Sequence, residues 1–246
     1  MICQNCHNEF EGNFCNHCGQ SAQVKRLDVT YLFKELPNSI FQLNRGFLFT
    51  AKEMLVRPGH AIRAFIEGRR KPYYQPVAFL LIVSTIYILV NFWLGVNTVF
   101  EDFLLGFESG AQGVENDVGD SAVRKWFSKY QAYAPLFVLP VFSVASFLAF
   151  RKSKYNYVEH VVLNVYITAQ QFIIFLLFSF FLSQGDIIVL LQIVVGIAFV
   201  FWTYFQFFKE KKRMAKLGLI LLTYVYFLLI FPLLIYLIGF VMGKLV

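Results

Sequence analysis

After residue 18 the sequence contains no cysteine, and charged side chains are scarce along its whole length. All four cysteines lie within the first eighteen residues, so no disulfide framework can hold the rest of the chain together. Only 15% of the residues are charged, whereas 58% are hydrophobic. Soluble domains are about 45–50% apolar, so this composition argues against a soluble protein and indicates a membrane protein.

The chain also lacks the basic residues and apolar run with which a secretory signal peptide begins. Residues 1–20 are polar and rich in turn-forming residues, so we expect them to stay in the reducing compartment where they are made. No Asp, Glu, Lys or Arg lies well inside any long apolar run. Proton- and ion-coupled transporters usually carry such groups along their pathway, and their absence disfavours that class.

Five apolar runs have about the length that a membrane-spanning helix needs, which is about 20 residues. They cover residues 77–97, 133–150, 161–182, 187–208 and 217–242. Proline occurs in the second run and in the last, where it is expected to kink the helix. The sequence therefore predicts an all-α membrane protein with about five transmembrane helices, which form a domain over residues 77–246.

The basic residues predict how this domain is oriented. With the N-terminus inside, residues 1–76, 151–160 and 209–216 hold 18 of the 22 Lys and Arg. Because basic residues mark the cytoplasmic side, we expect a multi-pass protein with its N-terminus in the cytoplasm and, after five spans, its C-terminus outside. Residues 98–130 would form the largest outer segment, which leads through a short interfacial helix into the second span.

The cysteines form two Cys-x2-Cys pairs separated by eight residues. Two such pairs can place four thiolates around one ion, so residues 1–20 are predicted to form a small zinc ribbon. The predicted ligands of its structural Zn2+ are Cys3, Cys6, Cys15 and Cys18. Twenty residues provide almost no core, so metal binding would supply the folding free energy. Phe10 and Phe14 are the expected apolar cover of the sulfurs, and a four-thiolate shell leaves no position for a substrate.

The cysteine pattern allows three alternatives to a four-thiolate zinc site. Cys3-x2-Cys6-His7 also has the spacing of c-type haem attachment, but that chemistry requires the far side of the membrane and leaves the second pair unexplained. A thioredoxin-like pair needs a βαβ context, which is missing. His7 or His17 could replace a cysteine ligand, although four thiolates already fill the shell. Residues 1–20 carry Glu9 and Glu11 but no Lys or Arg, so we expect a protein partner and no nucleic acid.

Residues 21–76 form a basic, amphipathic region in front of the first span. Their apolar spacing predicts two helices within residues 40–67 that lie on the membrane, the second of which begins at Pro58 and is stopped by Gly68. The basic residues on or next to these helices are Arg57, Arg63, Arg69, Arg70 and Lys71. Two interpretations remain open: the charges only fix the topology, or they contact an anionic lipid or ligand.

Short motifs in the first eighty residues carry a resemblance to a known family. They are Cys18-Gly19-Gln20, Gly46-x3-Thr50, Arg57-Pro58-Gly59, Ile66-Glu67-Gly68-Arg69-Arg70 and Tyr73-x2-Pro76. With these motifs the chain resembles an uncharacterised bacterial family, a domain-of-unknown-function family that combines a zinc ribbon with several membrane helices. The resemblance implies a protein of the bacterial inner membrane and favours zinc, but it implies no activity.

Within the spans, the polar residues Asn164, Thr168 and Gln171 recur at the spacing i, i+4 and i+7 and therefore share one helix face. Such a stripe is more typical of hydrogen bonds between helices than of a substrate path. Glu159 and His160, at the start of the third span, are two adjacent titratable residues without a nucleophile nearby, which is a weak signal for catalysis.

Three functions follow from these patterns. The favoured one is a non-enzymatic membrane protein that scaffolds, recruits or regulates a partner through the zinc ribbon, with anionic membrane lipids as further contacts. The alternative is a small transporter or lipid-handling protein, whose cavity Asn164, Gln171 and Gln192 would line. A membrane enzyme that acts on lipid headgroups through Glu159 and His160 is the least favoured, because the sequence contains no set of catalytic residues.

Overall fold

The computed structural model describes residues 1–34, 45–99, 134–181 and 186–245. In this part of the chain every regular element is a helix, and only isolated β-bridges occur near the N-terminus. Four helices are long and apolar enough to cross a membrane: α5 (Pro76–Leu94), α9 (Tyr157–Ser179), α10 (Asp186–Phe207) and α11 (Arg213–Leu245). The second predicted span is a shorter apolar helix, α8 (Ala134–Ala149). Beyond Val99, the predicted outer segment lies outside the described residues.

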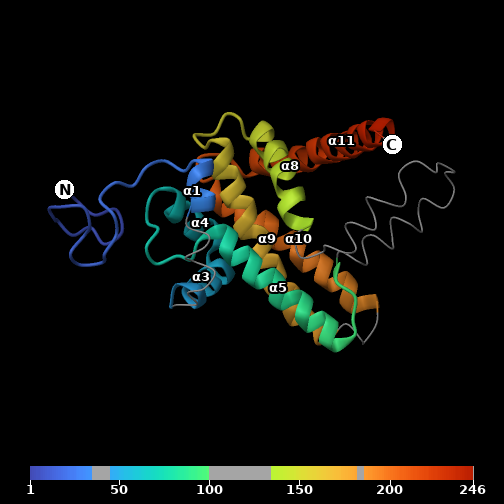
Figure 1. The fold of residues 1–246 in the computed structure, drawn as a ribbon, viewed down its shortest axis with the longest axis horizontal. Coiled ribbons are helices and arrows are strands. Elements are labelled where there is room, and N and C mark those ends of the chain that lie inside the picture. Colours follow the sequence, from blue (N-terminus) through green and yellow to red (C-terminus); the bar gives the residue numbers. More distant parts are fainter. Residues whose placement is uncertain (35–44, 100–133, 182–185, 246) are drawn as a thin grey trace.

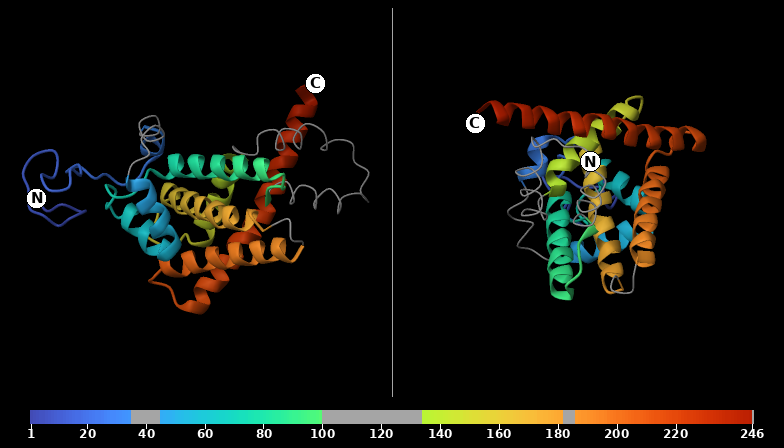
Figure 2. Two further views of the ribbon diagram at one scale, coloured as in Figure 1. Left: turned by 90° about the horizontal axis from the view of Figure 1, so that it is seen from below. Right: turned by 90° about the vertical axis from the view of Figure 1, so that its right-hand side faces the viewer.

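Helices α5, α9 and α10 run side by side and form the bundle (Figure 1). Helix α8 packs against α9 and also against α11. The long helix α11 leaves the other three candidate spans at a steep angle in every view (Figures 1 and 2). Few side chains of its described part, Arg213–Leu234, are buried, so most of the apolar surface of that part faces away from the rest of the protein.

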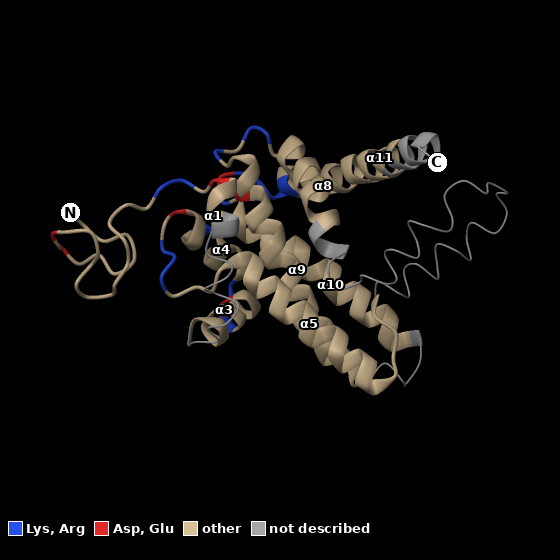
Figure 3. Ribbon diagram, in the orientation of Figure 1, with Lys and Arg blue, Asp and Glu red and all other residues tan. Residues whose placement is uncertain are grey.

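Charged residues gather at one end of the bundle, whereas the lengths of α5, α9 and α10 carry almost none (Figure 3). Polar contacts join segments at this end: Lys154 forms an ion pair with Glu67, and Lys216 of α11 donates a hydrogen bond to the carbonyl of Phe205 in the preceding helix. The described part of the chain therefore shows the charge asymmetry that is typical of a membrane protein with one basic side.

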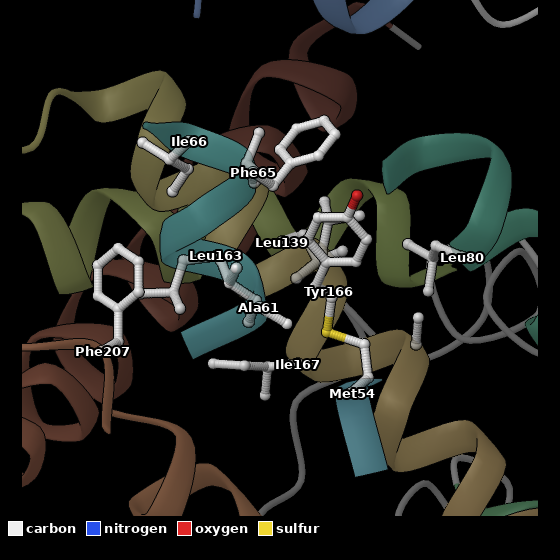
Figure 4. Close-up of a cluster of buried hydrophobic side chains, with 14 of the residues drawn as sticks. Met54, Ala61, Phe65, Ile66, Leu80, Leu139, Leu163, Tyr166, Ile167 and Phe207 are labelled. Atoms are coloured by element: carbon white, nitrogen blue, oxygen red, sulfur yellow. The ribbon is translucent and has the colours of Figure 1, made fainter. Parts of the chain in front are cut away.

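Two short helices lie at the charged end of the bundle: α3 (Arg45–Val56) and α4 (Pro58–Ile66). Their positions agree with the two helices predicted within residues 40–67, but α4 does not present its apolar side to a lipid surface. Ala61, Phe65 and Ile66 point into the core, beside Tyr166 of α9 and Phe207 of α10 (Figure 4). An apolar stripe indicates only that one face is buried, so the sequence pattern could not distinguish the protein core from the membrane surface.

Local sequence signals explain where α4 begins and ends. Pro58 occupies its first turn, where a missing N–H has no cost. At the other end Gly68 has a φ of +114°, a conformation that suits glycine. The amide of Gly68 donates to the carbonyl of Phe65, and the amide of Arg69 donates to that of Ala64. This pair of bonds is a Schellman motif, and it turns the chain toward the loop that leads to α5.

Helix α9 has a complete N-terminal cap. The side chain of Asn156 accepts from the amide of Glu159, and the carboxylate of Glu159 accepts from the amide of Asn156. Such a capping box satisfies two helix amides that have no partner within the helix. It also holds the carboxylate of Glu159 at the charged end of the bundle, where Arg26 bonds to it.

Candidate metal centre and its attachment to the bundle

The side chains of the four cysteines form one cluster. Their Sγ atoms all lie within 4.8 Å of one another, and none of them forms a disulfide. The shortest separations are 3.5 Å, between Cys3 and Cys18 and between Cys6 and Cys15. Four sulfurs arranged tetrahedrally at about 2.3 Å from a zinc ion are roughly 3.8 Å apart. The cluster therefore has about the size of a four-thiolate metal site, and these four residues could hold a metal ion.

Residues 1–22 consist of two equivalent halves that repeat after twelve residues. In the first half the amide of His7 donates to the carbonyl of Cys3, and in the second the amide of Gly19 donates to that of Cys15. The residue after each Cys pair has a positive φ, 60° for His7 and 70° for Gly19. The isolated β-bridges, Ile2 with Glu9 and Phe14 with Ser21, repeat at the same interval.

Electrostatics of the cluster favours a bound cation. A hydrogen bond from the Asn5 side chain, opposed by burial, lowers the pKa of the Cys18 thiol to about 6. A backbone hydrogen bond at Asn8 lowers the pKa of Cys6, but burial and the neighbouring thiols outweigh it and raise that pKa to about 12. Near neutral pH the four sulfurs therefore do not all ionise on their own. A thiolate-binding cation removes this conflict, because it stabilises all four negative charges together.

Only one of the two phenylalanines expected to cover the sulfurs does so. Phe10 is buried and packs with Cys3 and Cys15 in a small apolar cluster. Phe14, in contrast, is 65% exposed. Phe14 pairs with Ser21 in an isolated bridge, and its side chain lies on the outside of the second half. The expectation for Phe14 was therefore wrong.

Gln20 attaches the cysteine module, residues 1–20, to the rest of the protein. Its buried side chain donates a hydrogen bond of 3.0 Å to the carbonyl of Gly68. The side-chain oxygen of Gln20, Oε1, accepts from the amides of Arg70 and Lys71, at 3.2 and 3.3 Å. One glutamine thus bonds three main-chain groups of the loop between α4 and α5. Asn5 adds a hydrogen bond from the side chain of Arg69.

A second attachment lies in the linker that follows the module. The guanidinium of Arg26 makes two hydrogen bonds, of 2.8 and 2.9 Å, to the buried carboxylate of Glu159 and a third to the carbonyl of Lys154. This pairing raises the pKa of Arg26 above its usual value. The neighbouring residue, Leu27, is buried in the main core. The linker is therefore fixed to the start of α9 and does not tether the module loosely.

The five basic residues singled out in the sequence have different positions. Arg57, Arg69 and Lys71 are exposed, and Arg57 pairs with Glu53 one turn away. Arg63 is buried and donates to the carbonyls of Gln206 and Phe207 at the end of α10. A cation is favourable there, because the C-terminal end of a helix carries partial negative charge. These contacts leave Arg63 inside the protein, and lipid contact at the exposed residues stays a prediction.

Arg70 is the fifth of these residues, and it is half-buried. Its guanidinium lies 4.6 Å from the centre of the Tyr31 ring and donates to the carbonyl of Lys25. Burial lowers its pKa below the usual value for arginine. Lys25 lies between the cysteine module and the short helix α1 (Val29–Lys34), and Tyr31 lies in α1. Arg70 therefore helps to position the segment that joins the module to the bundle.

Of the predicted polar face on α9, Asn164 is the residue that joins several helices. It is buried, donates to the hydroxyls of Ser143 and Ser146 on α8, and accepts from the hydroxyl of Tyr204 on α10. Thr168 and Gln171 are half-buried further along α9. Asn164 thus acts as a tie between three helices. Its partners on α8 were not predicted from the sequence, although two serines three residues apart in an apolar helix are typical of a helix contact.

Glu159 and His160, the candidate pair for catalysis, point to different surroundings. The carboxylate of Glu159 is occupied by Arg26 and by the cap of α9. The Nδ1 atom of His160 lies 2.9 Å from the hydroxyl of Ser146, inside the bundle. The side chains of Phe147, Phe150 and Phe208 surround the imidazole ring. The two residues are neighbours in sequence and do not converge on one site.

Comparison with known proteins gives a short match. Residues 44–88 match the family described as "Protein of unknown function (DUF3667)". This segment contains α3, α4 and most of α5, and it includes the loop that Gln20 binds. No curated protein and no solved structure matches the chain. The match supports the resemblance to an uncharacterised family over these residues.

Proposed function

We propose that this chain is a non-enzymatic membrane protein that holds a metal-bound module at a fixed position, where the module recruits or scaffolds a protein partner. The observation that carries the proposal is the double attachment of the module, through Gln20 to the loop before α5 and through Arg26 to Glu159. A module that only capped the chain would need no such fixed placement relative to the membrane helices.

The chemistry of the cluster supports Zn2+ as the metal. Thiolates are the ligands preferred by zinc, Cu(I) and iron–sulfur clusters, and two Cys-x2-Cys pairs around a single tetrahedral site are typical of structural zinc. The four Sγ atoms form a closed shell that leaves no position for a reacting water or substrate. The proposed role of the metal is therefore structural: it holds the surface of the module in one shape.

The distribution of charge supports a location at the bacterial inner membrane, with the module in the cytoplasm and the C-terminus outside. The charged end of the bundle would face the cytoplasm, where basic residues accumulate. The exposed side chains of Arg57, Arg69 and Lys71 would there contact anionic headgroups. For the C-terminus to lie outside, α8 and α11 must both cross the membrane, together with α5, α9 and α10.

Purification of the full chain from native membranes, in wild-type form and as a Cys15→Ser variant, tests the proposal. We expect a defined protein to copurify in fixed proportion with the zinc-loaded wild type and to be lost from the variant. His17→Ala is the matched control, because His17 is exposed in the same half of the module and is not needed for a four-thiolate site. If the copurifying proteins are the same for wild type and Cys15→Ser, the recruiting function is excluded.

A small transporter or lipid-handling protein is the second candidate, and one observation favours it. The side-chain amide of Gln192 on α10 is buried, and neither its nitrogen nor its oxygen has a hydrogen-bond partner among the described residues. An unpaired amide in an apolar interior is costly, so a polar ligand or lipid group could be its partner. Native mass spectrometry tests this: a lipid or solute retained by the wild type should be lost from Gln192→Leu, whereas unchanged retention would exclude the idea.

A further inference from the structure

Two buried cations lie side by side at the end of α10. Lys216, in the first turn of α11, donates a hydrogen bond of 2.8 Å to the carbonyl of Phe205. Arg63 of α4 donates to the carbonyls of the next two residues, Gln206 and Phe207. Each of the two cations is only 8% exposed. Because their acceptors are three consecutive carbonyls, the two positive charges are held next to each other inside the charged end of the bundle.

Among the residues that the structure describes, no carboxylate forms an ion pair with either cation. The acidic residues at this end pair with other cations: Glu67 and Glu210 with Lys154, and Glu159 with Arg26. The carbonyls at the end of α10 together carry roughly half a negative charge, against two full positive ones. Buried charges are normally paired with an opposite charge, so this place has an excess of positive charge that a bound anion would balance.

Further positive charge surrounds the two cations. Lys216 lies close enough to Arg63 and to Arg213 for its charge to be repelled by both. On the other side of Arg63, partial burial, and after it the charges of Lys209 and Arg63, lower the pKa of His60 below its usual value. Helix α11 begins without an acidic residue in its first turn, and the start of a helix attracts anions. The cations and the helix start therefore favour the same kind of ligand.

We propose that Lys216 and Arg213 bind a phosphate group at the start of α11, with Arg63 behind them as a fixed positive charge. Lys216 is the centre of the site, because an ammonium group has three N–H donors and one of them has an acceptor in the described part of the chain. Arg213 is exposed, and its planar guanidinium offers the paired donors that suit a phosphate. Arg63 uses its donors on carbonyls and contributes its charge. The site is independent of the cysteine module and of the proposed recruiting function.

Apolar surface beside the site favours a phospholipid as the source of the phosphate. Met214, Leu217 and Leu221 are exposed and recur on α11 at the spacing i, i+3 and i+7, so they share one face. This face is adjacent to the side of the helix that carries Arg213 and Lys216. Acyl chains that lie along it would leave the headgroup phosphate at the charged end of the bundle (Figure 3). A soluble phosphate compound would offer the same charge and make no use of the apolar face.

Thermal melting of the full chain in detergent tests the site, because a ligand of the folded state raises the melting temperature. The probes are phosphatidylglycerol and phosphatidylcholine of the same short chain length, and inorganic phosphate. Phosphatidylglycerol should stabilise the wild type more than phosphatidylcholine does. Its apparent affinity should fall about fivefold or more in Lys216→Gln and in Arg213→Gln, because each removes one cation from the site. Lys152→Gln is the matched control: it removes an exposed cation from the loop between α8 and α9 and should keep the wild-type affinity.

The three probes also identify the source of the phosphate. If inorganic phosphate stabilises the wild type with the same dependence on Lys216 and Arg213, and phosphatidylglycerol does no better, the phosphate site stands and its ligand is soluble. Equal stabilisation by the two lipids without any effect of inorganic phosphate, or wild-type affinity in both variants, would overturn the proposal. Should Lys216→Gln fail to fold, Arg213→Gln decides, because the side chain of Arg213 is exposed and its replacement leaves the core unchanged.

Discussion

Residues 1–20 and the helical bundle differ in how they keep their shape. The module buries little more than Phe10 and its cysteines, and main-chain hydrogen bonds repeat in its two halves around the thiol cluster. The bundle is held by a continuous core of aromatic and aliphatic side chains (Figure 4). The metal should therefore decide the folding of the module alone, because apolar burial stabilises the bundle without it.

The largest expected effect is the loss of metal from Cys15→Ser. Removal of one thiolate opens the shell, and the module should change from about one bound zinc per chain to none and unfold, because structural zinc supplies roughly 10–16 kcal/mol of its stability. The bundle should melt at nearly the wild-type temperature. Its melting can be followed separately by fluorescence, because the module contains no Trp whereas Trp93 and Trp202 lie in α5 and α10.

His17→Ala provides the control for this prediction, and it should keep its zinc. Loss of metal from His17→Ala would contradict the four-thiolate assignment and favour a histidine ligand. A large fall in the melting temperature of the bundle in Cys15→Ser would show that the two regions fold together, and the contrast between them would then be wrong.

The second effect should appear in the bundle and leave the metal unchanged. A methyl group at Gly59 would lie 2.4 Å from Cβ of Gln206 and 2.5 Å from main-chain atoms of α10. Gly59→Ala should therefore push α4 from α10 and cost about 1–3 kcal/mol of bundle stability. The matched control is Gly218→Ala in α11, where a methyl group meets no atom within 4 Å. Equal melting temperatures for both variants in detergent would argue against close packing of α4 on α10.

A third prediction concerns the junction between the two regions. Gln20→Ala removes three hydrogen bonds to the loop of residues 68–71, and main-chain groups that lose their partners cost about 1–3 kcal/mol when they stay buried. Hydrogen exchange of the Arg70 and Lys71 amides should be about tenfold faster. Gln23→Ala, an exposed glutamine three residues further along, should leave exchange unchanged. Unchanged exchange in Gln20→Ala would mean that the module is not attached through this residue.

Several features of both regions could be predicted from the sequence, because each depends on a local pattern of residues. Cysteine spacing predicted a compact four-thiolate cluster, and long apolar runs predicted the helices that could cross a membrane. The end of α4 at Gly68 followed from a residue that tolerates positive φ. These features depend on residues close together in the chain, so their residue types are enough to reveal them.

Contacts between distant segments could not be predicted in this way. Gln20 binds main-chain atoms some fifty residues away. Because nearly every residue type carries the same main-chain groups, the sequence does not show which of them Gln20 will bind. Arg63 was one of five basic residues for which contact with an anionic lipid or ligand was left open, but the end of α10 offers it carbonyl partners inside the protein. The steep path of α11 depends on its packing against α8, which the apolar composition of either helix does not specify.

The smallest effect should come from the position after each Cys pair, where one half of the module has histidine and the other has glycine. His7 and Gly19 have nearly the same φ, 60° and 70°, yet only the glycine adopts this conformation without a steric penalty. His7→Gly should therefore stabilise the folded module by up to about 1 kcal/mol, part of which the greater freedom of glycine in the unfolded chain offsets. Competition with a zinc chelator should show a zinc affinity up to about fivefold higher than that of the wild type.

Gly19→His is the converse change, and it should weaken zinc binding by a similar or larger factor. A Cβ atom at Gly19 would lie 3.7 Å from the side chain of Lys71, an ordinary van der Waals distance, so the penalty comes from the positive φ of residue 19. If the two substitutions shift zinc affinity in opposite directions, the module behaves as two equivalent halves whose folding is coupled to the metal. A lower affinity for His7→Gly would instead show that the imidazole itself contributes to metal binding, and the four-thiolate shell would have to be revised.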